Sequence, residues 1–472
     1  MKRILCCIIS AFLMIISTIT TSAEVKYQEY TPDVKAYDVM SKDKKYRYGI
    51  DERTQDAWFA ESYEEYSTIL NIPAEIDGHK VVGVATTKSY SAYVVKLNFG
   101  KNIRYISPRS FLEKPVDKPG IPLCSVNYND SLECICKYAS LTGGSDRYTR
   151  GDEDIKLLRV PKSVKYVGHN GIARNCDTVV FDGSPILNYC SLSFYLSYND
   201  NNISVSPRKA VNRSGDIYFA SDAFGFHENA FNYETEINDH EDVPTCEVCP
   251  NVTLYRKNDA KDFEKFAKQG YEVKTYTDEW WKNIKEIQSV TLSGKGLQEK
   301  KDSAAHGTIT NLGWSASNDP AQYLSHEYTL SMKSGKKATL KSSFAPSDAF
   351  DDRMFFVSLN EDVVKVDVDS GEVTALKKGA ATVRCVAASG VFSDVIVYVD
   401  GATAADLPDH SAPAATAANT GKTADTTKSA PKTTKTSEPA KGSKVNPVYI
   451  AAPAAVVAAA LAAAVVIKKR RH

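Results

Sequence analysis

Short apolar segments separated by polar, turn-prone sequence recur through the middle of the chain and constrain its fold more than any other feature. The predicted strands are residues 69–73, 94–100, 124–128, 157–161, 178–181, 216–219 and 251–255. Several units add a second apolar step, as in residues 103–106 and 164–168. The spacing of the strands is irregular, roughly 20 to 38 residues. One unit cannot bury its apolar side alone, but stacked units share a core, so the pattern predicts a repeat solenoid.

Alternation within these strands divides their side chains between two faces of a sheet. This alternation predicts that Leu97 and Phe99 in one strand, and Leu158 and Val160 in another, point into the shared core. Their alternating neighbours then point to the open face, where a ligand would bind. The candidate ligand-binding residues on this face are Lys96, Asn98, Asn127 and Arg159.

Residues 70–84 are similar to the opening of BspA-like leucine-rich repeat proteins of bacterial surfaces. The distinctive part is a strand ended by Pro73, followed by Ile76-Asp77-Gly78 and Val81. Residues 172–177 and 249–254 resemble the cysteine-containing step of these repeats, although Ile172-Ala173 stands where Ala-Phe is usual. Residues 262–273 resemble the terminal helix and strand that close such arrays. The resemblance covers residues 46–276 and implies a mainly β, irregular leucine-rich repeat solenoid.

A second resemblance covers residues 327–400. Strands and turns alternate there about every ten residues, as in a small β-sandwich. The string from Gly371 to Gly379 is similar to the bacterial immunoglobulin-like domain, group 2, although Phe356-Val357-Ser358 replaces the usual Trp-Ser-Ser. Residues 277–326 form the predicted connector, with an amphipathic stretch from Trp280 to Ile287, a possible first sandwich strand at 289–292, and loop elsewhere.

The N-terminal residues have the pattern of a secretory signal peptide. A basic start at residues 1–3 precedes an apolar run at 4–19, and small residues end at Ala23. We expect cleavage after Ala23, which leaves residues 24–45 as a lead-in. The alternative is an uncleaved anchor helix, but the run is shorter than the ~20 residues of a membrane span.

The C-terminal residues predict a stalk and a membrane anchor. Residues 401–446 are rich in Ala, Thr, Pro and Lys, which is typical of a segment without a packed core. Residues 447–467 are apolar, and the basic tail 468–472 predicts a single span with its C-terminus inside the cell. A soluble alanine-rich helix is the alternative. Leu407-Pro408 begins like a cell-wall sorting motif, but the Thr-Gly of that motif is missing.

Charge and cysteine content limit the partners and the chemistry. The chain has 58 basic and 58 acidic side chains, so no basic excess favours nucleic acid. Eight cysteines remain after the expected cleavage, and their pairing is left unassigned because eight cysteines allow 105 connectivities. Cys134-Ile135-Cys136 is too tightly spaced for an easy bridge between its own members.

Motifs for catalysis, metals and cofactors are weak. Residues 367–372 resemble part of a calcium loop, but a hairpin turn explains them better. Cys246 and Cys249 have zinc-knuckle spacing without a second close pair, so a local disulfide or two buried repeat cysteines is favoured. We predict no catalytic residue, no metal site and no cofactor, and we expect that the protein is not an enzyme.

These features predict a single-pass cell-membrane protein that exposes its N-terminal region for adhesion or ligand binding. The expected partner is an extracellular protein or glycan, together with the membrane at the C-terminal helix. The alternative is a structural spacer or envelope scaffold without a specific ligand. A third and weaker hypothesis is a carbohydrate-active enzyme. It would require a cleft with two carboxylates ~5–10 Å apart.

Overall fold

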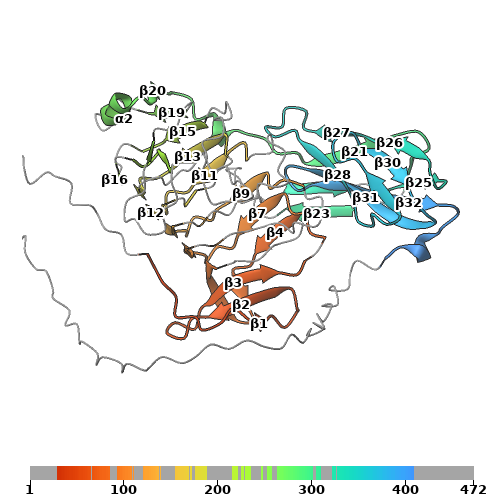
Figure 1. Cartoon of the computed structure of the whole chain (residues 1–472), viewed down its shortest axis with the longest axis horizontal. Helices are drawn as coiled ribbons and strands as arrows, with labels where there is room; N and C mark the ends of the chain where they lie inside the picture. The colour runs from red at the N-terminus through yellow and green to blue at the C-terminus, as the bar shows by residue number, and fades with distance from the viewer. Residues whose placement is uncertain are drawn as a thin grey trace, which may run out of the picture. The chain divides into compact units, whose positions relative to one another are not determined.

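In the computed structural model, strands from the N-terminal half of the chain alternate between two layers (Figure 1). The structure describes residues 29–408 except 65, 86–92, 109, 111–120, 138, 140–154, 170, 173–175, 189–214, 222–224, 228, 235–245, 248–251, 258–262, 301–304, 310–320 and 326. The predicted signal peptide, membrane span and tail lie outside these residues, as do most of the stalk, Cys190 and Cys249. No helix among the described residues is both long enough and apolar enough to span a membrane.

The first layer holds the strands that the sequence predicted. They are β4 (Ile69–Ile72), β7 (Lys96–Phe99), β9 (Ser125–Asn127), β11 (Leu158–Val160), β13 (Thr178–Phe181), β15 (Gly215–Phe219), β19 (Val252–Arg256) and β20 (Glu272–Thr275). Pairing is parallel within β4–β7–β9 and within β11–β13–β15–β19–β20, and β9 lies beside β11. We call the two sets of strands together the parallel layer.

The second layer begins with three strands that precede β4 and continues with the shorter apolar steps between the strands of the parallel layer. Its members are β1 (Val39–Met40), β2 (Tyr46–Ile50), β3 (Ala57–Ser62), β6 (His79–Val84), β8 (Tyr105–Ile106), β10 (Cys134–Ile135), β12 (Tyr166–Val167), β14 (Ile186–Leu187) and β16 (Gly225–Phe226). The first three strands are antiparallel, and pairing is parallel from β3 onward. Strand β5 (Glu75–Ile76) joins this layer at its side by pairing with β6, and β17 (Tyr233–Glu234) pairs with β18 (Cys246–Glu247) outside both layers.

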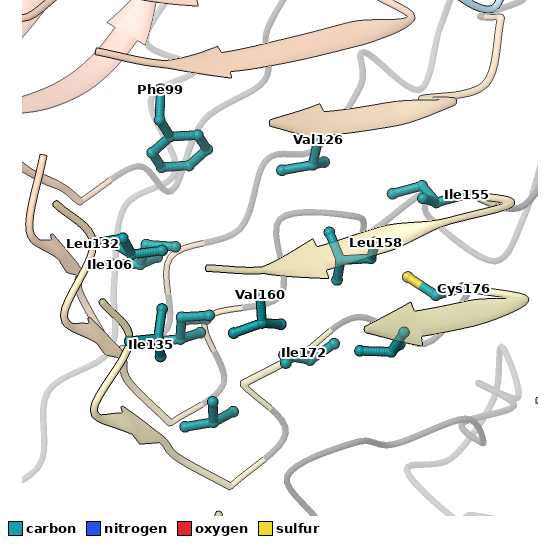
Figure 2. Close-up of a cluster of buried hydrophobic side chains, with 14 of the residues drawn as sticks. Phe99, Ile106, Val126, Leu132, Ile135, Ile155, Leu158, Val160, Ile172 and Cys176 are labelled. Atoms are coloured by element: carbon teal, nitrogen blue, oxygen red, sulfur yellow. The ribbon is translucent and has the colours of Figure 1, made fainter. Parts of the chain in front are cut away.

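The two layers share one apolar core. Figure 2 shows Phe99, Val126 and Leu158 of the parallel layer on one side of this core, with Ile106 and Ile135 of the second layer on the other. All five side chains are buried. The predicted inward phase of Leu97, Phe99, Leu158 and Val160 is therefore confirmed, since all four belong to this core.

The structure explains the Ile-Asp-Gly motif by the turn that its last two residues form. Asp77 and Gly78 are the two loop residues of the β5–β6 hairpin, and both have positive φ, 53° and 93°. Two-residue hairpins favour such turns because their twist matches that of the strands, and Asp-Gly adopts them readily. The Asp77 carboxylate also accepts hydrogen bonds from the Lys42 backbone N–H and the Tyr48 hydroxyl, which joins the hairpin to the N-terminal strands.

A helix and a final strand close the parallel layer at its C-terminal end. Helix α2 (Glu264–Gln269) buries Phe266 and ends at Gly270, which has φ of 107°. Glycine is favoured at this left-handed position because it has no Cβ. Strand β20 follows and pairs with β19, as the sequence predicted for residues 262–273.

The C-terminal part of the described chain is a β-sandwich. Its strands are β21 (Ser289–Ser293), β22 (Gln298–Glu299), β23 (Ala305–Ile309), β24 (Ala321–Ser325), β25 (Glu327–Met332), β26 (Lys337–Thr339), β27 (Lys341–Ala345), β28 (Met354–Ser358), β29 (Val364–Val366), β30 (Glu372–Ala375), β31 (Gly379–Ala387) and β32 (Phe392–Val399). Three sheets enclose a core that includes Val290, Leu330 and Val383. The prediction of loop after residue 292 was wrong, because β22, β23 and β24 lie there.

The segment proposed as either a calcium loop or a hairpin turn is a turn between β29 and β30. Asp367 Oδ1 accepts hydrogen bonds from the backbone N–H groups of Asp369 and Ser370, and Gly371 has φ of 65°. A Cβ on Gly371 would lie 2.6 Å from the Leu340 carbonyl oxygen, so glycine is needed for space as well as conformation. The antiparallel pairing of β29 with β30 confirms the hairpin.

Candidate ligand-binding face

The candidate face is the side of the parallel layer opposite the shared core, which we call the outer face. Its central feature is a ladder of asparagines at one register position of β4, β7 and β9. Asn98 Nδ2 donates to Asn71 Oδ1 at 2.8 Å, and Asn127 Nδ2 donates to Asn98 Oδ1 at 2.7 Å. Asn71 is exposed, whereas Asn98 and Asn127 are buried. At the end of the ladder, Asn127 Oδ1 is buried without a hydrogen-bond partner among the described residues.

Lys96 lies on the outer face but does not reach solvent. Its Nζ atom contacts both carboxylate oxygens of Glu286, at 2.9 and 2.7 Å. The Lys96 side chain is 0% exposed and that of Glu286 is 14% exposed. Removing two charges from water is costly unless they pair closely, and this pair satisfies that condition. Glu286 belongs to the junction segment, residues 277–288, which connects β20 with the sandwich.

The sandwich packs against the start of β4, β7 and β9. Phe355, Val357 and Val386 of β28 and β31 form one buried cluster with Val95 and Cys124, which directly precede β7 and β9. This contact lies beside the surface that the sequence predicted to be open.

Polar contacts join the same two surfaces. The Thr68 hydroxyl donates to the Gly390 carbonyl at 2.8 Å, and Arg384 Nη1 donates to the Tyr66 carbonyl at 2.9 Å. Arg384 is itself held by a two-pronged pair with Asp394. A Cβ on Gly390 would lie 2.4 Å from Ile69 Cγ1, so the turn between β31 and β32 approaches β4 closely because this residue is glycine.

A cleft of about 400 Å³, counting its open mouth, lies beside this contact. Its walls come from β9, the junction segment and the sandwich, and include Ser125, Glu286 and Asp351. Lys156 reaches Asp351 at 3.5 Å, and Arg353 pairs with the same carboxylate at 2.6 Å. Burial raises the pKa of Asp177 nearby, although the charges of Arg353 and Lys156 oppose that change.

Arg159 is the fourth candidate residue, and it remains partly accessible. Its Nη2 and Nε atoms both donate to Asp182 Oδ2, at 2.6 and 3.0 Å. The Arg159 side chain is 24% exposed. Burial raises the pKa of Asp182 above its ordinary value, while the charge and hydrogen bonds of Arg159 act in the opposite direction.

Aromatic side chains continue the outer face beyond Arg159. Tyr218 of β15 and Tyr255 of β19 occupy one register position and stack with ring centroids 4.4 Å apart and an interplanar angle of 7°. Trp281 of the junction segment is buried against Tyr218. Trp280 and Tyr255 are only half-buried, so this end of the face presents aromatic surface beside the Arg159–Asp182 pair.

The structure brings three of the four predicted residues together but corrects their exposure. The expectation that Lys96, Asn98 and Asn127 lie on an open surface was wrong, because all three side chains are buried. Lys96 pairs with Glu286 of the junction segment, and Asn98 and Asn127 bond to each other within the ladder. The three side chains do lie on the side of the layer opposite Leu97, as predicted. Arg159 lies at the border of the covered region and keeps partial access to solvent.

Sequence reasoning missed Asn71, Asp182 and Glu286 as parts of this face. A signal for Asn71 was present, because an asparagine between two apolar residues occurs in three successive strands. Glu286 carried no such signal, since its partner Lys96 is 190 residues away. Among the described residues, no group of three or more His, Cys, Asp or Glu side chains is arranged to hold a metal ion.

Comparisons with known proteins identify one domain. Residues 325–397 match the model of the bacterial Ig-like domain (group 2), so the sandwich contains a domain of this kind. No curated protein matches the chain.

Two solved structures show weak similarity. One is the C-terminal 282-residue fragment of intimin in complex with the intimin-binding domain of the translocated intimin receptor, at 15% identity and a TM-score of 0.15. It covers 25% of this chain, which in turn spans about a third (33%) of the fragment. The other is a T. pallidum leucine-rich repeat protein, at 17% identity and a TM-score of 0.22, covering 33% of this chain and 79% of that one. TM-scores this low do not establish a shared fold.

Proposed function

We propose that the protein is a membrane-anchored cell-surface protein that binds an extracellular protein or glycan through the outer face of its parallel layer. In this proposal the two layers form a leucine-rich repeat solenoid of the BspA-like kind, and the Ig-like domain supports it from the C-terminal side. Residues 1–23 direct export, residues 401–446 act as a stalk, and residues 447–467 span the membrane. The signal-peptide pattern and the basic tail after residue 467 support this arrangement.

The observation that carries the binding proposal is the accessible end of the outer face. Arg159 and Asp182 offer a charged donor and acceptor, and the half-buried rings of Tyr255 and Trp280, which both pack against buried Tyr218, offer aromatic surface. Arginine and aromatic side chains are the residues that most often dominate binding energy at protein interfaces. Aromatic rings have an apolar body with a polar tip, which suits a partner that is partly polar.

The proposal is tested with the full-length protein in detergent micelles, applied to arrays of glycans, matrix proteins and wall polymers. We expect saturable capture of one ligand class. Arg159→Glu is expected to weaken that capture by at least about tenfold, because a central charged contact is typically worth more than 1 kcal/mol. Lys337→Glu, on an exposed part of the sandwich, is the matched control and is expected to leave capture unchanged. A blank array, or equal capture by the Arg159→Glu protein, would contradict the proposal.

One observation favours the alternative, a structural spacer without a specific ligand. Lys96, Asn98 and Asn127 are used inside the molecule, where Lys96 joins the parallel layer to the junction segment and the two asparagines link β7 to β9. A spacer holds other parts of the cell surface at a set distance, and a junction fixed by a buried ion pair suits that role. The spacer predicts that capture stays blank while surface display of the chain persists.

A further inference from the structure

Two cysteines of the second layer lie in direct contact. Cys134 begins β10 and Cys136 follows it directly, so the two side chains share one face of the strand. Their Sγ atoms are 3.4 Å apart, and both residues are 0% exposed. A neighbouring thiol, burial and the Glu29 carboxylate together raise the pKa of the Cys136 thiol.

The N-terminal residues of the described chain lie across this pair. We call residues 29–33 the strap. The Glu29 carboxylate accepts a hydrogen bond from the Lys137 backbone N–H at 2.9 Å, directly after Cys136. A Cβ on Gly168, in the neighbouring turn, would lie 2.7 Å from Glu29 Oε1, so the strap fits because this position is glycine.

Tyr30 holds the strap in place. Its ring stacks on Tyr105, with centroids 4.6 Å apart, and on Trp58, with centroids 5.7 Å apart. Its hydroxyl donates to Asp51 at 2.9 Å. Tyr105 is the register neighbour of Cys134, so the strap is anchored beside the thiol pair.

We propose that Cys134 and Cys136 are a redox-modification site that forms an intramolecular disulfide by exchange with a small-molecule disulfide, and that the strap controls access to it. This inference goes beyond ligand binding and does not depend on it. One thiol loses its proton, and the thiolate attacks the small disulfide to form a mixed disulfide with release of one small thiol. The second protein thiolate then attacks the protein sulfur of the mixed disulfide and releases the second small thiol. Two protein thiols are oxidised, and one external disulfide is reduced to two thiols.

The geometry permits this bond. Residues two apart in a strand have Cα atoms about 6.6 Å apart, near the upper end of the bridgeable range of 4.4–6.8 Å. The sulfur atoms must close from 3.4 Å to about 2.05 Å, which side-chain rotation with a small backbone shift supplies. The sequence spacing predicted that Cys134 and Cys136 are too close for an easy bridge, but in the structure their side chains already face each other.

The test uses the full-length protein, fully reduced, then exposed in its native state to oxidised glutathione and alkylated. Trypsin places Cys124, Cys134 and Cys136 in one peptide, residues 110–137, so mass spectrometry follows all three thiols together. We expect this peptide to lose two hydrogens and to keep one alkylated cysteine, Cys124. Cys124→Ser is expected to preserve the loss of two hydrogens, whereas Cys136→Ser is expected to abolish it.

Three alkylated cysteines after oxidation, or a loss of two hydrogens that persists in Cys136→Ser, would overturn the site. The strap is tested separately with Tyr30→Ala, which is expected to raise the rate of disulfide formation about tenfold by removing the stacking and the hydrogen bond. Tyr30→Phe keeps the ring and is expected to fall between Tyr30→Ala and the unmodified protein. A thermal melt confirms that each variant is folded, and an unchanged rate in folded Tyr30→Ala would overturn the role of the strap.

Discussion

The outer face of the parallel layer has two halves that differ in how their polar side chains are used. On β4, β7 and β9, Lys96, Asn98 and Asn127 are buried, Lys96 pairs with the junction segment, and the sandwich packs against the start of these strands. From β11 onward, Arg159 and Tyr255 remain partly accessible. Both halves have the same parallel pairing and the same inward apolar residues, so strand pattern alone does not decide which polar side chains meet solvent.

The comparison shows that burial changes what a charged residue contributes. Lys96 and Arg159 occupy outer-face positions on strands of the same layer, and each has a carboxylate partner. The Lys96–Glu286 pair is nearly removed from water, whereas Arg159–Asp182 keeps contact with it. A buried pair is costly to break because the surviving charge has no solvent, while an exposed pair contributes little.

Removing Lys96 is expected to have the largest effect on this comparison. Lys96→Ala leaves the Glu286 carboxylate unpaired in a nearly buried site, which is expected to lower the free energy of unfolding by about 3–5 kcal/mol. Arg159→Ala, in the accessible half, is expected to cost about 1 kcal/mol or less. Urea denaturation measures both. The double variant Lys96→Met with Glu286→Leu is the control, and its recovery to near the unmodified stability would show that the unpaired charge causes the loss.

Gly390 tests whether the sandwich covers β4 as closely as its contacts indicate. Gly390→Ala places a Cβ 2.4 Å from Ile69 Cγ1 at φ of 90°, and is expected to cost about 2–4 kcal/mol and to expose the junction segment to protease. Gly335→Ala is the matched control, because φ is 74° and nothing lies within 4 Å. It is expected to cost about 1 kcal/mol. Equal losses in the two variants would show that the close approach to Ile69 does not matter.

The asparagine ladder spans the border between exposed and buried positions within the covered half. Asn98→Ala removes the acceptor of Asn127 and the donor of Asn71, and is expected to destabilise the protein by about 1–3 kcal/mol. Asn71→Ala, at the exposed end, is expected to cost about 0.5 kcal/mol or less. Thermal unfolding of both variants provides the measurement. A loss at Asn71 as large as that at Asn98 would contradict the idea that burial sets the cost.

The smallest expected effect concerns how the melting temperature depends on pH, which is expected to have opposite signs for variants of Asp182 and Glu133. Burial raises the pKa of Asp182, so its contribution to stability is fully present below the unfolded pKa and is lost as pH rises through the folded pKa. Asparagine does not ionise, so Asp182→Asn does not lose this stability as pH rises. The difference in melting temperature, variant minus unmodified protein, is therefore expected to rise between pH 3 and pH 6.

Glu133 in the second layer is the matched comparison, because its side chain is 20% exposed, as is that of Asp182. Burial opposes ionisation of Glu133, but hydrogen bonds and charges from Lys165 and Arg104 outweigh it and lower its pKa. Its contribution is therefore present above the unfolded pKa and is lost as pH falls. Glu133→Gln is expected to show a relative melting temperature that falls between pH 3 and pH 6. Trends of the same sign in both variants would contradict these assignments.

Local pattern predicted much of this fold, and distant contacts explain what it missed. Strand positions and the inward phase of Leu97 and Val160 follow from period-two alternation, which is visible within five residues. The Asp77–Gly78 turn is equally local, although these residues were used only for the family resemblance and no turn was predicted there. Burial of Lys96 was not local, because its partner Glu286 lies 190 residues away. The contact of the sandwich with this edge joins Thr68 and Gly390, which are 322 residues apart. The same reason explains why an open binding face was predicted where the sandwich lies.

The central claim is that the junction segment buries Lys96 at the start of the outer face, where the sandwich also packs, while Lys274 of β20 at the other end of the face stays accessible. Lysine labelling of the native full-length protein with a succinimidyl ester, followed residue by residue by mass spectrometry, tests it most directly. The account predicts that Lys96, which is 0% exposed, stays unlabelled while Lys274 of β20, at 47%, reacts fully. Labelling of Lys96 at the rate of Lys274 would contradict it, because the first half of the face would then be open.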